Sequence, residues 1–160
     1  MASTITSATM TVTITEKIVL NGRDQGAKNT LSVSSINEIS KRIVTATTNK
    51  LEILSFGTAM GKGSFVKADV RYMRFTNLDD TNFLTLTFRN QDNDEFAMKV
   101  DAGNSFMLFA DNSGGMVGMF IATQDADANS DVALGSLTNI QADANTGNCD
   151  LEVFIASTNG

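Results

Sequence analysis

Polar and apolar residues alternate along much of this chain, and this period of two constrains the fold more than any other feature. From residue 10 to residue 20, apolar side chains occupy one parity and mainly threonine the other, interrupted by Glu16. Such alternation is typical of a strand with one buried and one solvent-facing side. Threonine, valine and isoleucine also favour strands. The pattern predicts an all-β protein.

The clearest local prediction is a β-hairpin over residues 83–101. Between two alternating segments, 84–89 and 95–101, lie the four polar residues Gln91 to Asp94 after Asn90, and such residues are typical of a turn. Further strands are expected at residues 10–20, 30–34, 42–48, 51–56, 65–76, 105–110, 116–123 and 149–155. About eight to ten antiparallel strands with polar turns predict a β-sandwich of jelly-roll-like topology.

Three segments depart from simple alternation. Ile36, Ile39 and Ile43 are spaced by three and four, so residues 35–42 could form one short helical turn or a strand. The apolar parity changes at Tyr72 and Met73, which indicates either a bulge or burial on both faces. Residues 105–110 and 116–123 are apolar on both parities, and we expect central strands there.

The length of 160 residues fits one domain with its own core. We expect a polar N-terminal arm at residues 1–9, a single β-sandwich at 10–156 and a short tail at 157–160; a two-domain arrangement is less favoured. The first residues lack a basic segment followed by an apolar one, so no signal peptide is expected. No apolar stretch approaches the roughly 20 residues of a membrane helix.

The composition argues against catalysis. The chain has no histidine and one cysteine, Cys149, which excludes Ser–His and Cys–His nucleophiles and a thiolate metal cluster within one chain. The net charge is −6 and the longest basic run is Lys41-Arg42, whereas nucleic-acid binding normally needs clustered basic residues. We therefore expect no enzyme, no cofactor, and neither nucleic acid nor membrane as a partner.

Several motifs have ordinary explanations. Residues 57–64 approach a phosphate-binding loop, but the spacing is short and a strand is expected next, so a glycine-rich loop is favoured. Asp125, Asp127, Asn129 and Asp131 alternate as calcium ligands do. Later positions of that loop lack the required glycine and glutamate, so calcium is a weak prediction beside a solvated loop. Adjacent acids such as Asp79 and Asp80 are expected in turns.

Candidate contact residues come from two places. Tyrosine and arginine are enriched at protein interfaces, which draws attention to Arg71, Tyr72 and Arg74. In the polar arm, Thr4 and Ile5 are candidates because an arm of this kind can become ordered against a neighbouring subunit. Cys149 occupies the inward parity of its strand and is expected to be a buried apolar side chain.

The segment VRYMRFTNLDDTNFLTL (residues 70–86), with FAMKVDAGNSF (residues 96–106), is the most distinctive part of the sequence. It resembles small β-sandwich virion proteins of tailed bacteriophages, of the head decoration, cement or fibre type. The opening TITEKIVLNG (residues 13–22) and the closing strand are similar to the same group. The resemblance implies a structural piece of the head or tail and transfers no active residues.

From this resemblance we expect a capsid decoration or cement protein located in the virion. It would form a homo-oligomer, with a trimer as the first expectation, and would bind the major capsid protein or other virion proteins. The alternative is a tail or fibre attachment protein that binds a host surface glycan through loops 111–115 and 125–131. A free carbohydrate-binding module is less favoured because tryptophan is absent.

Overall fold

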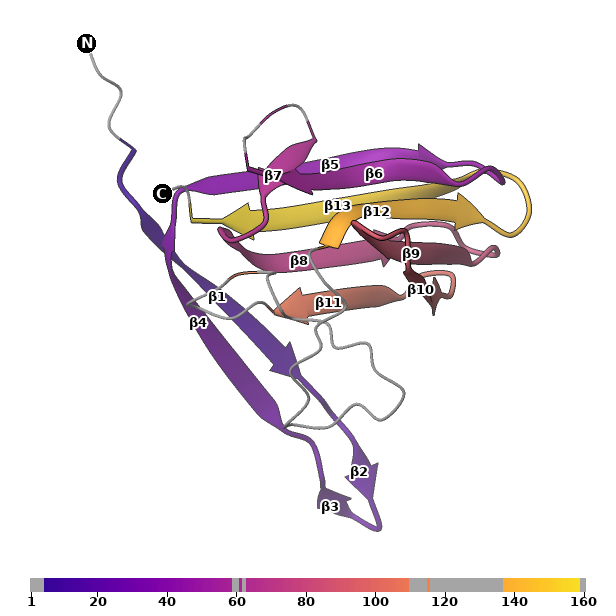
Figure 1. The fold of residues 1–160 in the computed structure, drawn as a ribbon. Coiled ribbons are helices and arrows are strands. Elements are labelled where there is room, and N and C mark those ends of the chain that lie inside the picture. The colour runs from indigo at the N-terminus through magenta and orange to yellow at the C-terminus, as the bar shows by residue number, and fades with distance from the viewer. Residues whose placement is uncertain (1–4, 59–60, 62, 110–114, 116–136, 159–160) are drawn as a thin grey trace. The chain divides into compact units, whose positions relative to one another are not determined.

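The structure is a computed structural model and describes residues 5–58, 61, 63–109, 115 and 137–158. It contains two compact units, residues 1–37 (unit 1) and 38–160 (unit 2). Unit 1 contains β1 (Ala8–Thr15), β2 (Val19–Leu20), β3 (Arg23–Asp24) and β4 (Lys28–Ile36). Unit 2 contains β5 (Glu38–Ala46), β6 (Leu51–Gly57), β7 (Ser64–Val66), β8 (Val70–Asn77), β9 (Leu84–Asn90), β10 (Glu95–Val100), β11 (Ser105–Phe109), β12 (Leu137–Ala144) and β13 (Cys149–Ser157). The described residues form strands and no helix, which confirms the all-β prediction (Figure 1).

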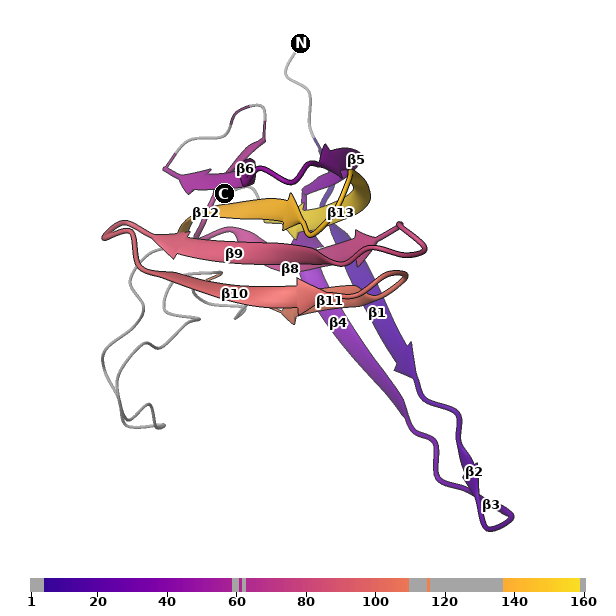
Figure 2. The same cartoon turned by 90° about the vertical axis from the view of Figure 1, so that its right-hand side faces the viewer.

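Unit 1 is a long β-hairpin. β1 pairs antiparallel with β4, and β2 pairs with β3 next to the turn, as Figure 2 shows. Asn21 and Gly22 form the turn with φ angles of 52° and 76°. A two-residue hairpin turn needs this left-handed backbone, because it matches the twist of the flanking strands. The Asn-Gly pair therefore fixes where the ribbon reverses.

Unit 2 is a β-sandwich. Its two sheets have the strand orders β10-β9-β12-β6-β7 and β11-β8-β13-β5, and all pairs are antiparallel except β6 with β7. Leaving the short β7 aside, the chain alternates between sheets at every described connection except the β9–β10 hairpin. Eight strands arranged as β5-β13-β8-β11 over β6-β12-β9-β10 follow jelly-roll order, as the prediction expected.

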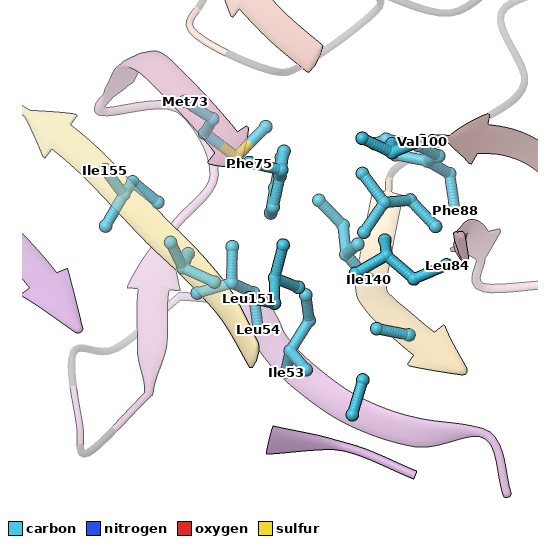
Figure 3. Close-up of a cluster of buried hydrophobic side chains, with 14 of the residues drawn as sticks. Ile53, Leu54, Met73, Phe75, Leu84, Phe88, Val100, Ile140, Leu151 and Ile155 are labelled. Carbon is cyan, nitrogen blue, oxygen red and sulfur yellow. The ribbon is translucent and has the colours of Figure 1, made fainter. Parts of the chain in front are cut away.

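The core of unit 2 lies between the two sheets. Phe75 of β8 meets Phe88 of β9 across the sandwich, with ring centroids 6.5 Å apart and planes at 87°, a favourable edge-to-face contact. Figure 3 shows these rings among aliphatic side chains from both sheets. Cys149 is buried in the same cluster, as its parity predicted. The alternating apolar residues of each strand thus supply the inner faces.

Most strand predictions hold. The hairpin over 83–101 is confirmed, with β9 and β10 in continuous antiparallel register. Tyr72 and Met73 are both buried, and the register of β8 with β13 shifts between Tyr72 and Val70, so both a bulge and burial on two faces accompany the change of parity. The loop before β7 leads into a strand and not a helix, which agrees with a loop between strands. Strand β12 was not predicted, because its apolar positions are partly alanine and a register irregularity follows Leu137.

One open alternative is decided and one prediction is wrong. Residues 35–42 form no helical turn, since Ile36 ends β4 and β5 begins at Glu38. Ile39 and Ile43 lie on the solvent-facing parity of β5, while Val44 and Ala46 of the same strand turn inward. In the part of the chain that the structure describes, β11 is an edge strand rather than a central one. Residues 116–123 lie outside the described residues.

Candidate functional site

The outer face of the four-stranded sheet of unit 2 is the candidate contact surface. Strand register places side chains from all four strands on the side opposite the core. These outer-face residues are Ile39, Lys41 and Ile43 on β5, Glu152 and Phe154 on β13, Tyr72, Arg74 and Thr76 on β8, and Ser105, Met107 and Phe109 on β11. They divide into a polar network, an aromatic cluster and an apolar edge.

The polar network centres on the carboxylate of Glu152. Its two oxygens lie 3.0 Å from Nζ of Lys41 and 2.6 Å from Nη2 of Arg74. Arg74 also donates to Oγ1 of Thr76 at 2.5 Å, and that hydroxyl is 2.8 Å from Oγ of Ser105. Hydrogen bonds from Lys41 and Arg74 lower the pKa of Glu152. The network links all four strands, and Lys41 and Arg74 compensate the negative charge of Glu152.

The aromatic cluster centres on Tyr72. Its ring lies 5.3 Å from Phe109 and 5.8 Å from Phe154, in tilted and edge-on arrangements. Only 4% of Tyr72 is exposed. Burial raises its pKa, while the charge of Arg74 and a hydrogen bond with it act in the opposite direction. The single tyrosine therefore already has contacts within its own chain.

The apolar edge is formed by β5, which among the described strands pairs only with β13. Ile39 and Ile43 are 59% and 60% exposed, on either side of Lys41. An edge strand presents unpaired backbone donors and acceptors, and exposed apolar side chains on it favour a protein partner. Lys41 is the kind of residue that limits indiscriminate edge pairing. This edge is the part of the surface most available for contact.

The outer face of the other sheet is different. Register places Thr85, Thr87 and Arg89 of β9 beside Asn139 and Gln141 of β12 there. These side chains are polar, and Thr87 among them is buried while the other four are partly exposed. The exposed isoleucines therefore distinguish one face of unit 2 from the other.

The predicted contact residues are only partly brought together. Tyr72 and Arg74 are neighbours on this surface, whereas Arg71 donates to the carbonyl of Ala68 at 2.7 Å. Ile5 is exposed in unit 1. Thr4 lies outside the described residues, as do all four calcium candidates, Asp125, Asp127, Asn129 and Asp131.

Sequence reasoning missed Ile39 and Ile43 as surface residues, whereas the alternation of the closing strand correctly predicts Glu152 on its outward side. The spacing of the isoleucines by three and four hid the period of two, in which Ile39, Lys41 and Ile43 share a parity. That shared parity was the usable signal. No sequence signal indicated that Glu152 would meet Arg74, because the two residues are distant along the chain.

Asp79 illustrates an acid used for structure. Its Oδ1 accepts the backbone N–H groups of Asn82 at 2.6 Å and Thr81 at 2.8 Å. These bonds lower the pKa of Asp79, and burial raises the pKa of the nearby Cys149 thiol. Asp79 thus fixes the β8–β9 loop, which agrees with the prediction of a turn.

Within the described ranges, no three histidine, cysteine or acidic side chains are grouped so that they could hold a metal ion. A search of the same residues found no helix able to cross a membrane. Comparisons with family models, with curated proteins and with solved structures gave no match to this chain. The paired charges and exposed isoleucines of this surface are chemically suited to contact with another protein.

Proposed function

We propose that this protein is a non-catalytic structural component of a tailed-phage virion, a decoration or cement protein on the capsid surface. The observation that carries the proposal is the apolar edge of β5, where Ile39 and Ile43 are the most exposed large apolar side chains among the described residues of unit 2. The resemblance of residues 70–86 and 96–106 to small virion proteins supplies the biological setting.

The jelly-roll order is compatible with this role. Jelly rolls occur in viral capsid proteins and also in lectins, and a fold alone does not decide between them. Glycan binding commonly uses exposed aromatic rings, but the only tyrosine, Tyr72, is covered by Phe109 and Phe154. The aliphatic edge favours a protein partner over a sugar.

The polar network favours a contact that leaves the surface unchanged. Glu152 already has two cationic partners, so covering the face would not bury an unpaired charge, which is costly. Burial of Ile39 and Ile43 against a shell protein would then provide the favourable free energy. The capsid proteins would be joined by a preformed surface without rearrangement.

The test is to locate and count the chain in purified particles of the phage that encodes it. Quantitative mass spectrometry and cryo-EM should find it on the head, in hundreds of copies. A few copies on the tail would support the attachment alternative and overturn the cement role. Absence from the particle would overturn the virion role altogether.

A matched pair of variants sharpens this test. Ile43→Ser on β5 should strongly reduce the amount of protein retained on the particles. Leu51→Ser removes a comparably exposed side chain, 42% accessible on the other sheet, and should leave retention unchanged. Equal retention of both variants would show that β5 is not the capsid contact.

A further inference from the structure

Unit 1 has little core of its own. Its described residues contribute only Val33 and Ile36 to the buried apolar side chains, and neither belongs to the main core cluster. An isolated two-stranded hairpin is marginally stable in water. The exposed large apolar residues of unit 1 are Ile5, Ile18, Val19, Leu20 and Leu31. Such a ribbon needs a partner to cover its apolar side chains.

The apolar side chains are most concentrated at the tip of the hairpin. Ile18, Val19 and Leu20 follow one another and are 54%, 63% and 59% exposed. Gln25 donates its backbone N–H to the carbonyl of Ile18 at 2.9 Å, directly beside this run. The tip is thus ordered by hydrogen bonds, which lowers the entropic cost of binding.

The ribbon is also amphipathic along its length. Val12 faces Leu31 across the two strands, and Met10 faces Val33, on one side of the ribbon. The other side has threonine and serine pairs such as Thr13 with Thr30, whose hydroxyl oxygens are 3.5 Å apart. One side can therefore remain in water while the other favours burial.

The charges indicate what covers this side. Residues 1–37 contain three basic and two acidic side chains, all between positions 16 and 28, whereas residues 38–160 contain nine basic and sixteen acidic ones. Lys17 and Arg23 flank the apolar tip. The net charge is therefore +1 for residues 1–37 and −7 for residues 38–160, so contact of the hairpin with unit 2 is electrostatically more favourable than contact between two hairpins or two copies of unit 2.

We propose that unit 1 is an intersubunit clasp whose tip, Ile18 to Leu20, binds unit 2 of a second copy of this chain. The second copy offers both the acidic charge and exposed apolar side chains outside the β5 edge, such as Leu78 and Met98. This inference rests on the homo-oligomeric part of the proposed function, and it holds whether or not the oligomer sits on a capsid.

Photo-crosslinking of the purified full-length protein tests the clasp. Val19→Cys is labelled with benzophenone maleimide, because the native Cys149 is buried. Equal amounts of ¹⁴N- and ¹⁵N-labelled protein are mixed before illumination, and the products are mapped by mass spectrometry. The clasp predicts light–heavy crosslinks from the tip to peptides of residues 38–160. Thr48→Cys, an exposed site on unit 2, controls for random collisions.

Crosslinks within single chains only, or between two tips, would overturn the clasp. Sedimentation supplies a second test: Val19→Ser with Leu20→Ser should weaken self-association at least tenfold, while Leu51→Ser should not. A native protein that stays monomeric at all concentrations, or a tip variant that associates as the native protein does, would contradict the proposal. Neither result bears on the Ile43→Ser retention test, so failure of the clasp and failure of the capsid role are distinguishable.

Discussion

The two units use the same alternating sequence pattern with opposite results. In unit 2, apolar side chains from two sheets meet and form a closed core, including the Phe75–Phe88 contact. The described strands of unit 1 form a single ribbon without a second sheet within that unit, and its tip residues Ile18, Val19 and Leu20 are exposed. Full burial of a valine, leucine or isoleucine contributes about 1.5–3 kcal/mol. Alternation therefore specifies a buried face, but a second layer decides whether burial occurs within the chain.

The largest expected effect is a loss of unfolding free energy that differs between the two units. Phe88→Ala removes a fully buried ring that stacks on Phe96 at 4.6 Å and meets Phe75, and should cost about 3–5 kcal/mol of unfolding free energy. Ile14→Ala in the half-exposed ribbon should cost far less, about 1 kcal/mol or below. Denaturant unfolding measures both. Similar losses would contradict the difference between the units.

A smaller effect is expected at the hairpin turn. Gly22 has φ +76°, a conformation that costs other L-residues about 1 kcal/mol or more. Gly22→Ala should therefore speed amide exchange in β2 and β3 about tenfold, with unit 2 unchanged. Gly57→Ala is the control, because a Cβ there meets nothing within 4 Å. A change of amide exchange in unit 2, or no change in the hairpin, would mean that the turn does not govern unit 1.

The smallest expected effect is electrostatic and confined to unit 2. The pKa of Glu152 is lowered from its ordinary 4.5 in the folded state, so its stabilising contribution is complete above that pH and is lost as the pH falls through the lowered pKa. Glu152→Gln should reduce stability at pH 7 by about 1 kcal/mol or less and should flatten the acid-side loss. A variant with the native pH profile would show that the network contributes nothing.

Sequence reasoning predicted strand identity better than strand neighbours. A short turn joins the two alternating segments within residues 84–101, so the pairing of β9 with β10 could be predicted from the sequence. The pairing of Cys149 with Ala46 joins distant parts of the chain, and alternation carries no information about which distant strand is adjacent. Hence the sequence could not predict that Glu152, Arg74 and Lys41 lie together on one outer face.

The points that the sequence left open have local causes. Residues 35–42 satisfied helical and strand periodicity at once, and pairing of β5 with β13 decided between them. The Asn21-Gly22 turn could be predicted from the sequence, since this dipeptide is a strong hairpin signal. Unit 1 is defined only by the pairing of β1 with β4, Lys28–Ile36. Neither pattern could predict which surface covers the apolar side of the ribbon.

Hydrogen exchange of the full-length protein at two concentrations tests most directly whether unit 1 is completed by a second copy. The amides of β1, β2, β3 and β4 should exchange rapidly in dilute protein and become protected at concentrations where the chain self-associates. The core amides of unit 2, such as those of Phe75 and Leu151, should be protected equally in both samples. Unit 1 amides that are equally protected in dilute protein would contradict the account.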